Sequence, residues 1–471
     1  MSLKIKEFGI WLFFIITSSL CAMWLFLYDH SADNYTNIAF LPMVFTICNI
    51  ISVVIYKKLL ENVGLALLHC LMYIRLVVIP FLMTQAGYIS VYKRISEINI
   101  NRAITLMSYE CVAIYIVLAF LVIHSCKKDI TRDSSYSENI LNVSRPSLLF
   151  RSILTIMVVY CVAVWIFVPT CRDMYKTVFE FSDVAFTSSD YDVSKENVGS
   201  LARSLQTLFK VFFDIIRLVI PMNILIALKR KGSNPICSIV IGLLFALVQL
   251  FFITQTTARA IIFSFLIIYF ISKLYPKYSK IIIRTSIFVS VFVIISYFSI
   301  RFIVGSRYGN ELSEYLSKIF GAYFGGLDNV AAGGNLPEGY EASTFFASLY
   351  SAIPFNTTLF GLKVENLQSI FNTVNGSYGQ IPPMVVESSY YFGEALAPVI
   401  SCICAFFAYH FGERFSKTDS SWHLVSNLFL AIICAISIVM YNEEILLVWL
   451  LEWLVPMKIL SNLADRERRL E

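Results

Sequence analysis

The chain has 471 residues, of which 58% are hydrophobic and 15% are charged, and its formal net charge is +5 at pH 7. Soluble domains carry about a quarter charged residues, so this composition, with a mean hydropathy of +0.71, excludes an ordinary soluble enzyme. The small net charge gives no reason to expect a nucleic-acid partner.

The apolar residues fall into blocks of about 20, the length that an α-helix needs to cross a bilayer. Backbone groups in lipid must be satisfied within the segment, so these blocks are expected to be helices. The sequence therefore predicts an all-α polytopic membrane protein with a single transmembrane domain over residues 1–471. About twelve transmembrane helices are expected, at 8–28, 38–56, 64–84, 103–124, 151–170, 204–228, 236–253, 258–275, 281–303, 391–410, 421–441 and 443–460.

Lysine and arginine gather in one set of loops, which the positive-inside rule places in the cytoplasm. Both termini belong to that set, and the alternate loops are acidic, with Glu443 and Glu444 in the last of them. We therefore expect a multi-pass protein with both termini cytoplasmic. The basic loop 85–102 is the one that departs from the rule.

Two of the outward loops are large, 171–203 and 304–390. In the second, apolar residues recur at helical spacing from Leu312 to Tyr323, which predicts a helix lying along the membrane surface. Ala342–Tyr350 is a second helix candidate, and Asn372–Pro383 has the composition of a polar loop. Because the loop is this long and lies between two spans, we expect it to contain the active site, on the extracytoplasmic side.

Two arginines, Arg75 and Arg217, lie near the middle of expected spans. A cation at that depth is costly, so it usually faces a cavity or a partner. Both are candidates for binding an anionic substrate. The alternative for Arg217 is a local ion pair with Asp214, three residues earlier, whereas Arg75 has no carboxylate on its own helix.

Further arginines stand at the outer ends of spans or just beyond them. Guanidinium groups match phosphate oxygens in bidentate fashion, so such a set suits a lipid diphosphate. The alternative is that the side chains reach to lipid headgroups. The set consists of Arg203, Arg259, Arg301 and Arg307.

The loop 304–390 also offers four carboxylates as candidate general bases, Asp328, Glu338, Glu341 and Glu387, and Asp328 is also a candidate for substrate binding. Glu387 stands among apolar and aromatic residues, where a carboxylate has a raised pKa; the alternative is a helix N-terminal carboxylate. Aromatic residues such as Tyr391 are candidates for stacking on sugar rings, although interfacial aromatics also anchor membrane proteins. Asp190-Tyr191-Asp192 has the D-x-D spacing that can hold a divalent metal, but in an acidic loop this spacing is weak evidence for a metal site. We predict no metal and no cofactor.

The layout of twelve spans and two large outward loops resembles a bacterial O-antigen polymerase of the Wzy type, an oligosaccharide repeat-unit polymerase. The resemblance also rests on Arg75 before Pro80, on Thr257-Ala258-Arg259, and on the stretch Glu387 to Gly393. One departure is that some members carry an arginine followed eleven residues later by glycine in both loops. No arginine of either large loop here has that spacing.

The resemblance implies a GT-C-like membrane glycosyltransferase in the bacterial inner (plasma) membrane. It would transfer a growing glycan from undecaprenyl diphosphate to a new lipid-linked repeat unit, with Glu387 and Arg259 as catalytic residues. A polysaccharide chain-length regulator would be a further partner. The alternatives are a flippase or transporter of the same lipid-linked oligosaccharide, and an O-antigen ligase. Ligases tend to place a histidine in the large loop, and residues 304–390 contain none.

Overall fold

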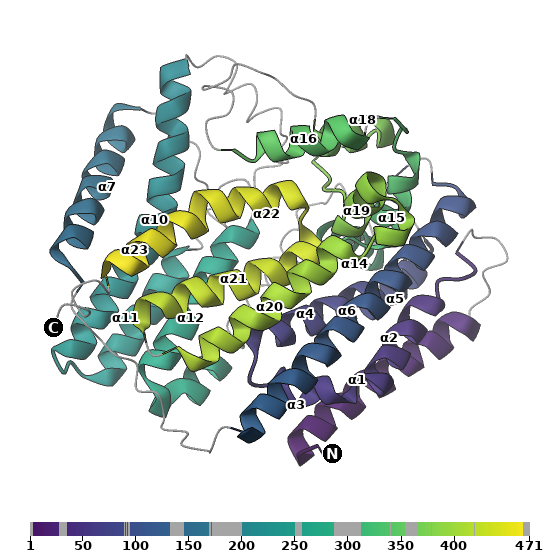
Figure 1. The fold of residues 1–471 in the computed structure, drawn as a ribbon, viewed down its shortest axis with the longest axis horizontal. Coiled ribbons are helices and arrows are strands. Elements are labelled where there is room, and N and C mark those ends of the chain that lie inside the picture. Colours follow the sequence, from purple (N-terminus) through teal and green to yellow (C-terminus); the bar gives the residue numbers. More distant parts are fainter. Residues whose placement is uncertain are drawn as a thin grey trace.

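The computed structural model describes residues 3–27, 35–88, 90, 92, 95–131, 146–168, 171, 200–249, 257–286, 312–339, 341–353, 366–377, 379–418 and 420–464. Within these residues the regular elements are all helices (Figure 1), which confirms the predicted all-α class.

Seven helical segments are long and apolar enough to cross a membrane, or up to nine if two bent pairs each count as one span. Such a set of helices is that of a polytopic membrane protein. Twelve were expected, and the expected span 281–303 lies mostly outside the described residues. The seven are Ile5–Leu27, Val63–Gln85, Glu97–Lys127, Leu148–Phe167, Ser204–Arg230, Glu394–Lys417 and Trp422–Met440.

The bent pairs show where the expected spans are interrupted. The helix Phe40–Ile51 meets Val53–Leu59 at 68°, and Ile261–Leu274 meets Pro276–Ser286 at 114°. Pro276 has no N–H to continue a helical ladder, which accounts for the second break. The last expected span consists of three consecutive pieces, Glu443–Trp449, Leu450–Leu454 and Val455–Ala464, each too short to cross a membrane alone.

The first six helices form one side of the bundle (Figure 1). A single π-helical turn, Ile74–Val78, interrupts the third expected span between α4 and α5. Their bounds are α1 (Ile5–Leu27), α2 (Phe40–Ile51), α3 (Tyr56–Leu59), α4 (Val63–Tyr73), α5 (Ile79–Gln85) and α6 (Glu97–Thr131).

Of the remaining bundle helices, α12, α20, α22 and α23 pack against α21, and 89% of the residues in its most apolar stretch are buried. Helix α10 packs against α7, α11 and α12, and α7 also packs against α23. The close approach of α4 to α20 depends on Gly64, because a Cβ there would lie 2.1 Å from the Ala408 carbonyl oxygen. The bounds are α7 (Leu148–Phe167), α10 (Ser200–Arg230), α11 (Pro235–Val248), α12 (Thr257–Leu274), α20 (Val399–Lys417), α21 (Ser421–Met440), α22 (Glu443–Trp449), a π-helical turn (Leu450–Leu454) and α23 (Val455–Ala464).

Five short helices of the large loop gather at one end of the bundle, which we call the loop end (Figure 1). They are α14 (Leu312–Tyr323), α15 (Leu327–Ala332), α16 (Glu341–Ser351), α18 (Leu367–Asn375) and α19 (Met384–Phe392).

The loop helices agree with two of the three sequence predictions. Helix α14 has the predicted bounds and packs against α5, and α16 extends the predicted segment by one residue at each end. The prediction of a polar loop over Asn372–Pro383 is wrong for its first four residues, because residues 372–375 form the last turn of α18, whereas residues 376–377 and 379–383 are not helical. That helix ends at Gly376, whose φ of 58° suits a residue without a Cβ.

Candidate functional site

The Glu387 carboxylate lies at the loop end of the bundle, in the first turn of α19. The helix begins directly after Pro383, whose fixed φ and missing N–H suit a helix start. The Pro383 carbonyl accepts hydrogen bonds from the N–H groups of Val386 and Glu387, at 2.8 and 3.2 Å. Glu387 is fully buried, although carboxylates seldom are unless they are paired.

Glu387 faces the first turn of α22, a helix from a different part of the chain. Its Oε2 accepts a hydrogen bond of 2.8 Å from the backbone N–H of Glu443. Its Oε1 has no hydrogen-bond partner among the described residues. The same turn is capped by Asn442, whose Oδ1 accepts from the Ile445 N–H at 3.0 Å. The carboxylate therefore occupies a helix N-terminus, which favours negative charge, yet it is cut off from water.

Three glutamates meet here, and we call Glu387, Glu443 and Glu444 the carboxylate cluster. Burial raises the pKa of Glu387 well above its ordinary value, and the neighbouring Glu443 carboxylate raises it further, while the Glu443 N–H acts in the opposite direction. Burial also raises the pKa of Glu443 to about 7. Like charges in a low-dielectric site disfavour each other's ionisation, so the cluster retains a proton near neutral pH.

Other loop helices supply polar partners to the carboxylate cluster. Tyr391 lies one turn after Glu387 on α19, and its hydroxyl acts to lower the pKa of the Glu443 carboxyl. Its hydroxyl is also 3.1 Å from Ser348 Oγ on α16. The Asn366 amide, which caps α18, contacts both carboxylate oxygens of Glu444 at 3.0 and 2.8 Å. The structure thus brings Glu387 and Tyr391 together at one place, joined by α16, α18 and α22.

Sequence reasoning did not include Glu443 and Glu444 in the site. It used them only to orient the chain, as acidic residues of an outward loop. The sequence signal that could have identified them as site residues is a pair of adjacent carboxylates at the start of an apolar helix. The same pattern is common at helix N-termini, where it has no functional meaning. What distinguishes them is the contact with Glu387, 56 residues away in the chain.

Arg75 forms a fully buried ion pair within the bundle. Its Nη1 lies 2.7 Å from Glu110 Oε2 on α6, and neither side chain is exposed. Its Nε donates to the Gly325 carbonyl at 2.9 Å, and Ser401 donates a hydroxyl to Glu110. Arg75 has no carboxylate on its own helix, as expected, but its partner comes from the next span. Arg75 therefore joins the span to the large loop at Gly325 and does not contact the carboxylate cluster.

Arg217 has the local partner that the sequence offered. Its Nη1 lies 3.5 Å from Asp214 Oδ1, three residues earlier on α10. The guanidinium also lies over the Phe263 ring, 4.5 Å from the centroid. Both charged side chains are buried, so the structure places Arg217 in a helix–helix contact.

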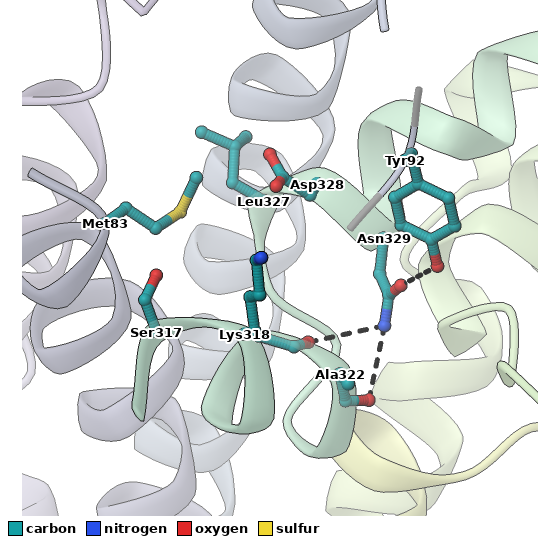
Figure 2. A pocket seen from close by; sticks show the side chains of 9 residues that line it. Met83, Tyr92, Ser317, Lys318, Ala322, Leu327, Asp328 and Asn329 are labelled. Carbon is teal, nitrogen blue, oxygen red and sulfur yellow. Dashed lines mark hydrogen bonds between the residues drawn. The ribbon is translucent and has the colours of Figure 1, made fainter. Parts of the chain in front are cut away.

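Asp328 lies in a different place from Glu387. Its Oδ1 accepts a 2.9 Å hydrogen bond from the Tyr35 hydroxyl, and burial raises its pKa. It lines a small pocket between α14 and α15 (Figure 2), and no member of the carboxylate cluster lines this pocket. The lining residues are Met83, Tyr92, Ser317, Lys318, Gly321, Ala322, Leu327, Asp328 and Asn329.

The outer arginines are only partly placed. Arg203 and Arg259 lie near the N-termini of α10 and α12, and their side chains are outside the described part of the structure. Arg301, Arg307 and the segment Asp190–Asp192 also lie outside the described residues. Among the residues that are described, no group of three or more His, Cys, Asp or Glu is arranged to hold a metal ion.

No protein-family model, no curated protein and no solved structure matches this chain.

Proposed function

We propose that the protein polymerises lipid-linked oligosaccharide repeat units of O-antigen or a similar surface polysaccharide. The supporting observation is the buried carboxylate cluster, whose Glu387 combines a raised pKa with an oxygen that has no hydrogen-bond partner among the described residues. A general base works best when its pKa is near the working pH. Burial and like charge are the means by which proteins raise a carboxyl pKa toward that value.

The proposed reaction is a glycosyl transfer between two lipid-linked glycans. The terminal sugar hydroxyl of a new repeat unit attacks the anomeric carbon of the growing glycan and forms the new glycosidic bond. The bond between that carbon and the undecaprenyl diphosphate breaks, and the diphosphate leaves with the electron pair. Glu387 accepts the hydroxyl proton, and Glu443 and Tyr391 position its carboxylate. The donor is already activated by its diphosphate, so the scheme uses no nucleotide.

Arginines at the outer ends of spans would hold the departing diphosphate and offset its charge. Arg259 is proposed as catalytic, with Arg203, Arg301 and Arg307 as further diphosphate contacts. The scheme assumes that the loop end faces away from the cytoplasm of a bacterial inner membrane and that both termini are cytoplasmic. It also assumes a GT-C-like layout of about twelve spans.

The test is the banding of surface polysaccharide in a strain that lacks the gene and carries variants of it. Glu387→Gln and Arg259→Ala should each abolish polymer while single lipid-linked units persist. Glu338→Gln is the matched control, because Glu338 is an exposed carboxylate of the same loop. Normal chain lengths from both site variants at normal expression would overturn the site assignment.

A flippase for the same lipid-linked units is the second candidate, and the buried Arg75–Glu110 pair is the observation that favours it. Ionisable pairs within a membrane often mark substrate or ion pathways. A deletion strain separates the two functions. Surface glycan limited to one repeat unit indicates a polymerase, whereas the absence of any surface unit indicates a flippase.

A further inference from the structure

A basic pocket lies at the end of the bundle opposite the loop end. It is formed where the end of α20, the start of α21 and α23 meet, and its volume is about 440 Å³. The sequence predicts this end to be cytoplasmic. The residues that line the basic pocket are His410, Glu413, Arg414, Lys417, Thr418, Ser420, His423, Asn427 and Lys458.

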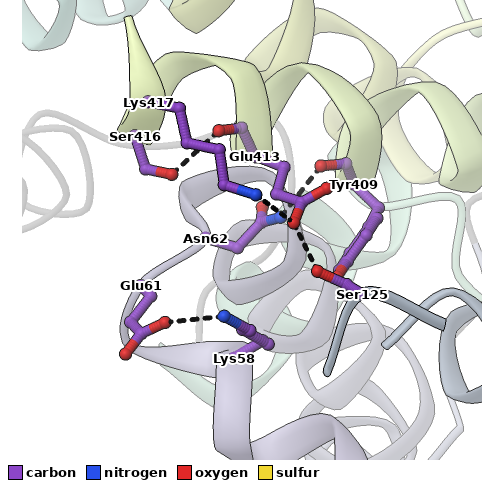
Figure 3. A network of polar contacts seen from close by, with 8 residues as sticks. All are labelled: Lys58, Glu61, Asn62, Ser125, Tyr409, Glu413, Ser416 and Lys417. Carbon is purple, nitrogen blue, oxygen red and sulfur yellow. Dashed lines mark hydrogen bonds and ion pairs between the residues drawn. The ribbon is translucent and has the colours of Figure 1, made fainter. Parts of the chain in front are cut away.

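The single carboxylate of the described lining is already engaged. Glu413 accepts a 2.9 Å hydrogen bond from Lys417 Nζ and another from the Ser125 hydroxyl (Figure 3). Arg414 and Lys458 are both exposed. Counting Arg414, Lys417 and Lys458 against Glu413, and leaving the two histidines out of the count, the described lining carries two net positive charges. Asp419 lies outside the described residues. The basic pocket is therefore suited to a phosphate group.

Apolar surface adjoins the basic pocket on the helices that build it. On α20, Phe406 and Phe407 are exposed about two turns before Arg414. On α23, Val455 and Ile459 are exposed beside Lys458. The His410 ring stacks on Phe406, with ring centroids 5.8 Å apart and planes within 8°. Apolar side chains exposed on a membrane protein face acyl chains, whereas a basic rim next to them faces headgroups.

We propose that the basic pocket binds the phosphate of an anionic phospholipid from the leaflet on the predicted cytoplasmic side, with the acyl chains along the apolar faces of α20 and α23. Basic pockets between transmembrane helices on the cytoplasmic side hold anionic headgroups in this way. A soluble phosphate compound shares the headgroup chemistry but would gain nothing from the apolar faces. The acyl chains therefore distinguish the two sources.

The experiment uses the full-length protein purified in detergent, with bound lipid measured by native mass spectrometry. Phosphatidylglycerol and phosphatidylcholine with the same acyl chains are titrated separately. The variant Arg414→Gln with Lys458→Gln removes two cations of the basic pocket. The control, Arg230→Gln with Lys231→Gln, removes two exposed cations near the C-terminal end of α10. Melting midpoints of both variants are compared with that of the wild type to verify folding.

Wild-type protein and the control should prefer phosphatidylglycerol over phosphatidylcholine, and the pocket variant should bind phosphatidylglycerol roughly thirtyfold more weakly. Equal binding of the two lipids by the wild type would overturn the proposal without reference to any variant. An equal loss in the control would also overturn it. If millimolar inorganic phosphate displaces the lipid completely, the site takes a soluble phosphate and the lipid assignment is wrong.

Discussion

Replacing Glu443 with glutamine should stabilise the protein above neutral pH and change little at pH 5. Burial raises the pKa of this carboxyl from its ordinary value of 4.5 to about 7. The folded protein therefore retains a proton that the unfolded chain releases between those two values. Stability falls as pH rises through that window and is lowest above the folded pKa. Glutamine has a similar shape and carries no charge at any of these pH values, so the variant avoids this loss.

The size of the effect follows from the pKa. Each pH unit between the folded and unfolded values is worth about 1.4 kcal/mol. A rise from 4.5 to about 7 therefore lowers the stability of the wild type by about 3 kcal/mol at pH 8 relative to its stability at pH 4. The loss of the Glu443 charge also removes one cause of the raised Glu387 pKa, which adds to the effect in the same direction.

The assay is unfolding of the full-length protein in mixed micelles, titrated with SDS and followed by tryptophan fluorescence at pH 5, 6, 7 and 8. The measured quantity is the difference in unfolding free energy between Glu443→Gln and the wild type at each pH. That difference should grow by about 2.5 kcal/mol from pH 5 to pH 8, because part of the change already occurs below pH 5. The exposed carboxylate Glu338, changed to glutamine, provides the control. A difference that does not vary with pH would refute the burial argument and weaken the assignment of a raised pKa to the carboxylate cluster.

Three further outcomes are expected. The rate of polymer formation in membranes should rise from pH 5 to pH 8, because the proposed general base Glu387 must be ionised and burial raises its pKa well above its ordinary value; a rate that is flat over this range would contradict this. Arg75→Met should lower stability by about 3–5 kcal/mol by leaving Glu110 buried without its partner, and adding Glu110→Gln should restore most of the loss, as measured by SDS unfolding. Gly64→Ala should cost about 1–3 kcal/mol, because its Cβ would overlap the Ala408 carbonyl. Gly9→Ala, with open space around it, should be neutral or slightly stabilising, and equal melting midpoints for the two variants would argue against the tight contact.

Local patterns in the sequence predicted local structure well. The apolar spacing in Leu312–Tyr323 gave the bounds of α14, because helical periodicity is set by the residues of the helix itself. The Asp214–Arg217 contact was visible for the same reason, since residues three apart share a helix face. Arg102, in the basic loop that departs from the positive-inside rule, is offset by Glu394 at 2.6 Å.

Contacts between distant segments could not be read from the sequence. Glu110 is an isolated carboxylate in an apolar span, and only the packing of α6 against the turn that holds Arg75 identifies it as an ion-pair partner. In the same way, the apolar and aromatic neighbours of Glu387 in the chain mark it as a candidate general base, but the hydrogen bond to its carboxylate comes from α22. The interruption of spans by π-helical turns also has no simple sequence signal, because it depends on the side chains that pack around each turn.

The π-helical turn at Ile74–Val78 separates two parts of one span that pack against different elements. The part before the turn, α4, packs closely against α20, because Gly64 has no side chain to separate the two backbones. The part after the turn, α5, packs against α14 of the large loop. Wide turns of this kind bend more readily than regular helix. If the loop moved relative to the bundle, the change in backbone angles would therefore be largest at this turn. Arg75 lies in the turn, and its hydrogen bond to the Gly325 carbonyl connects the turn to the loop.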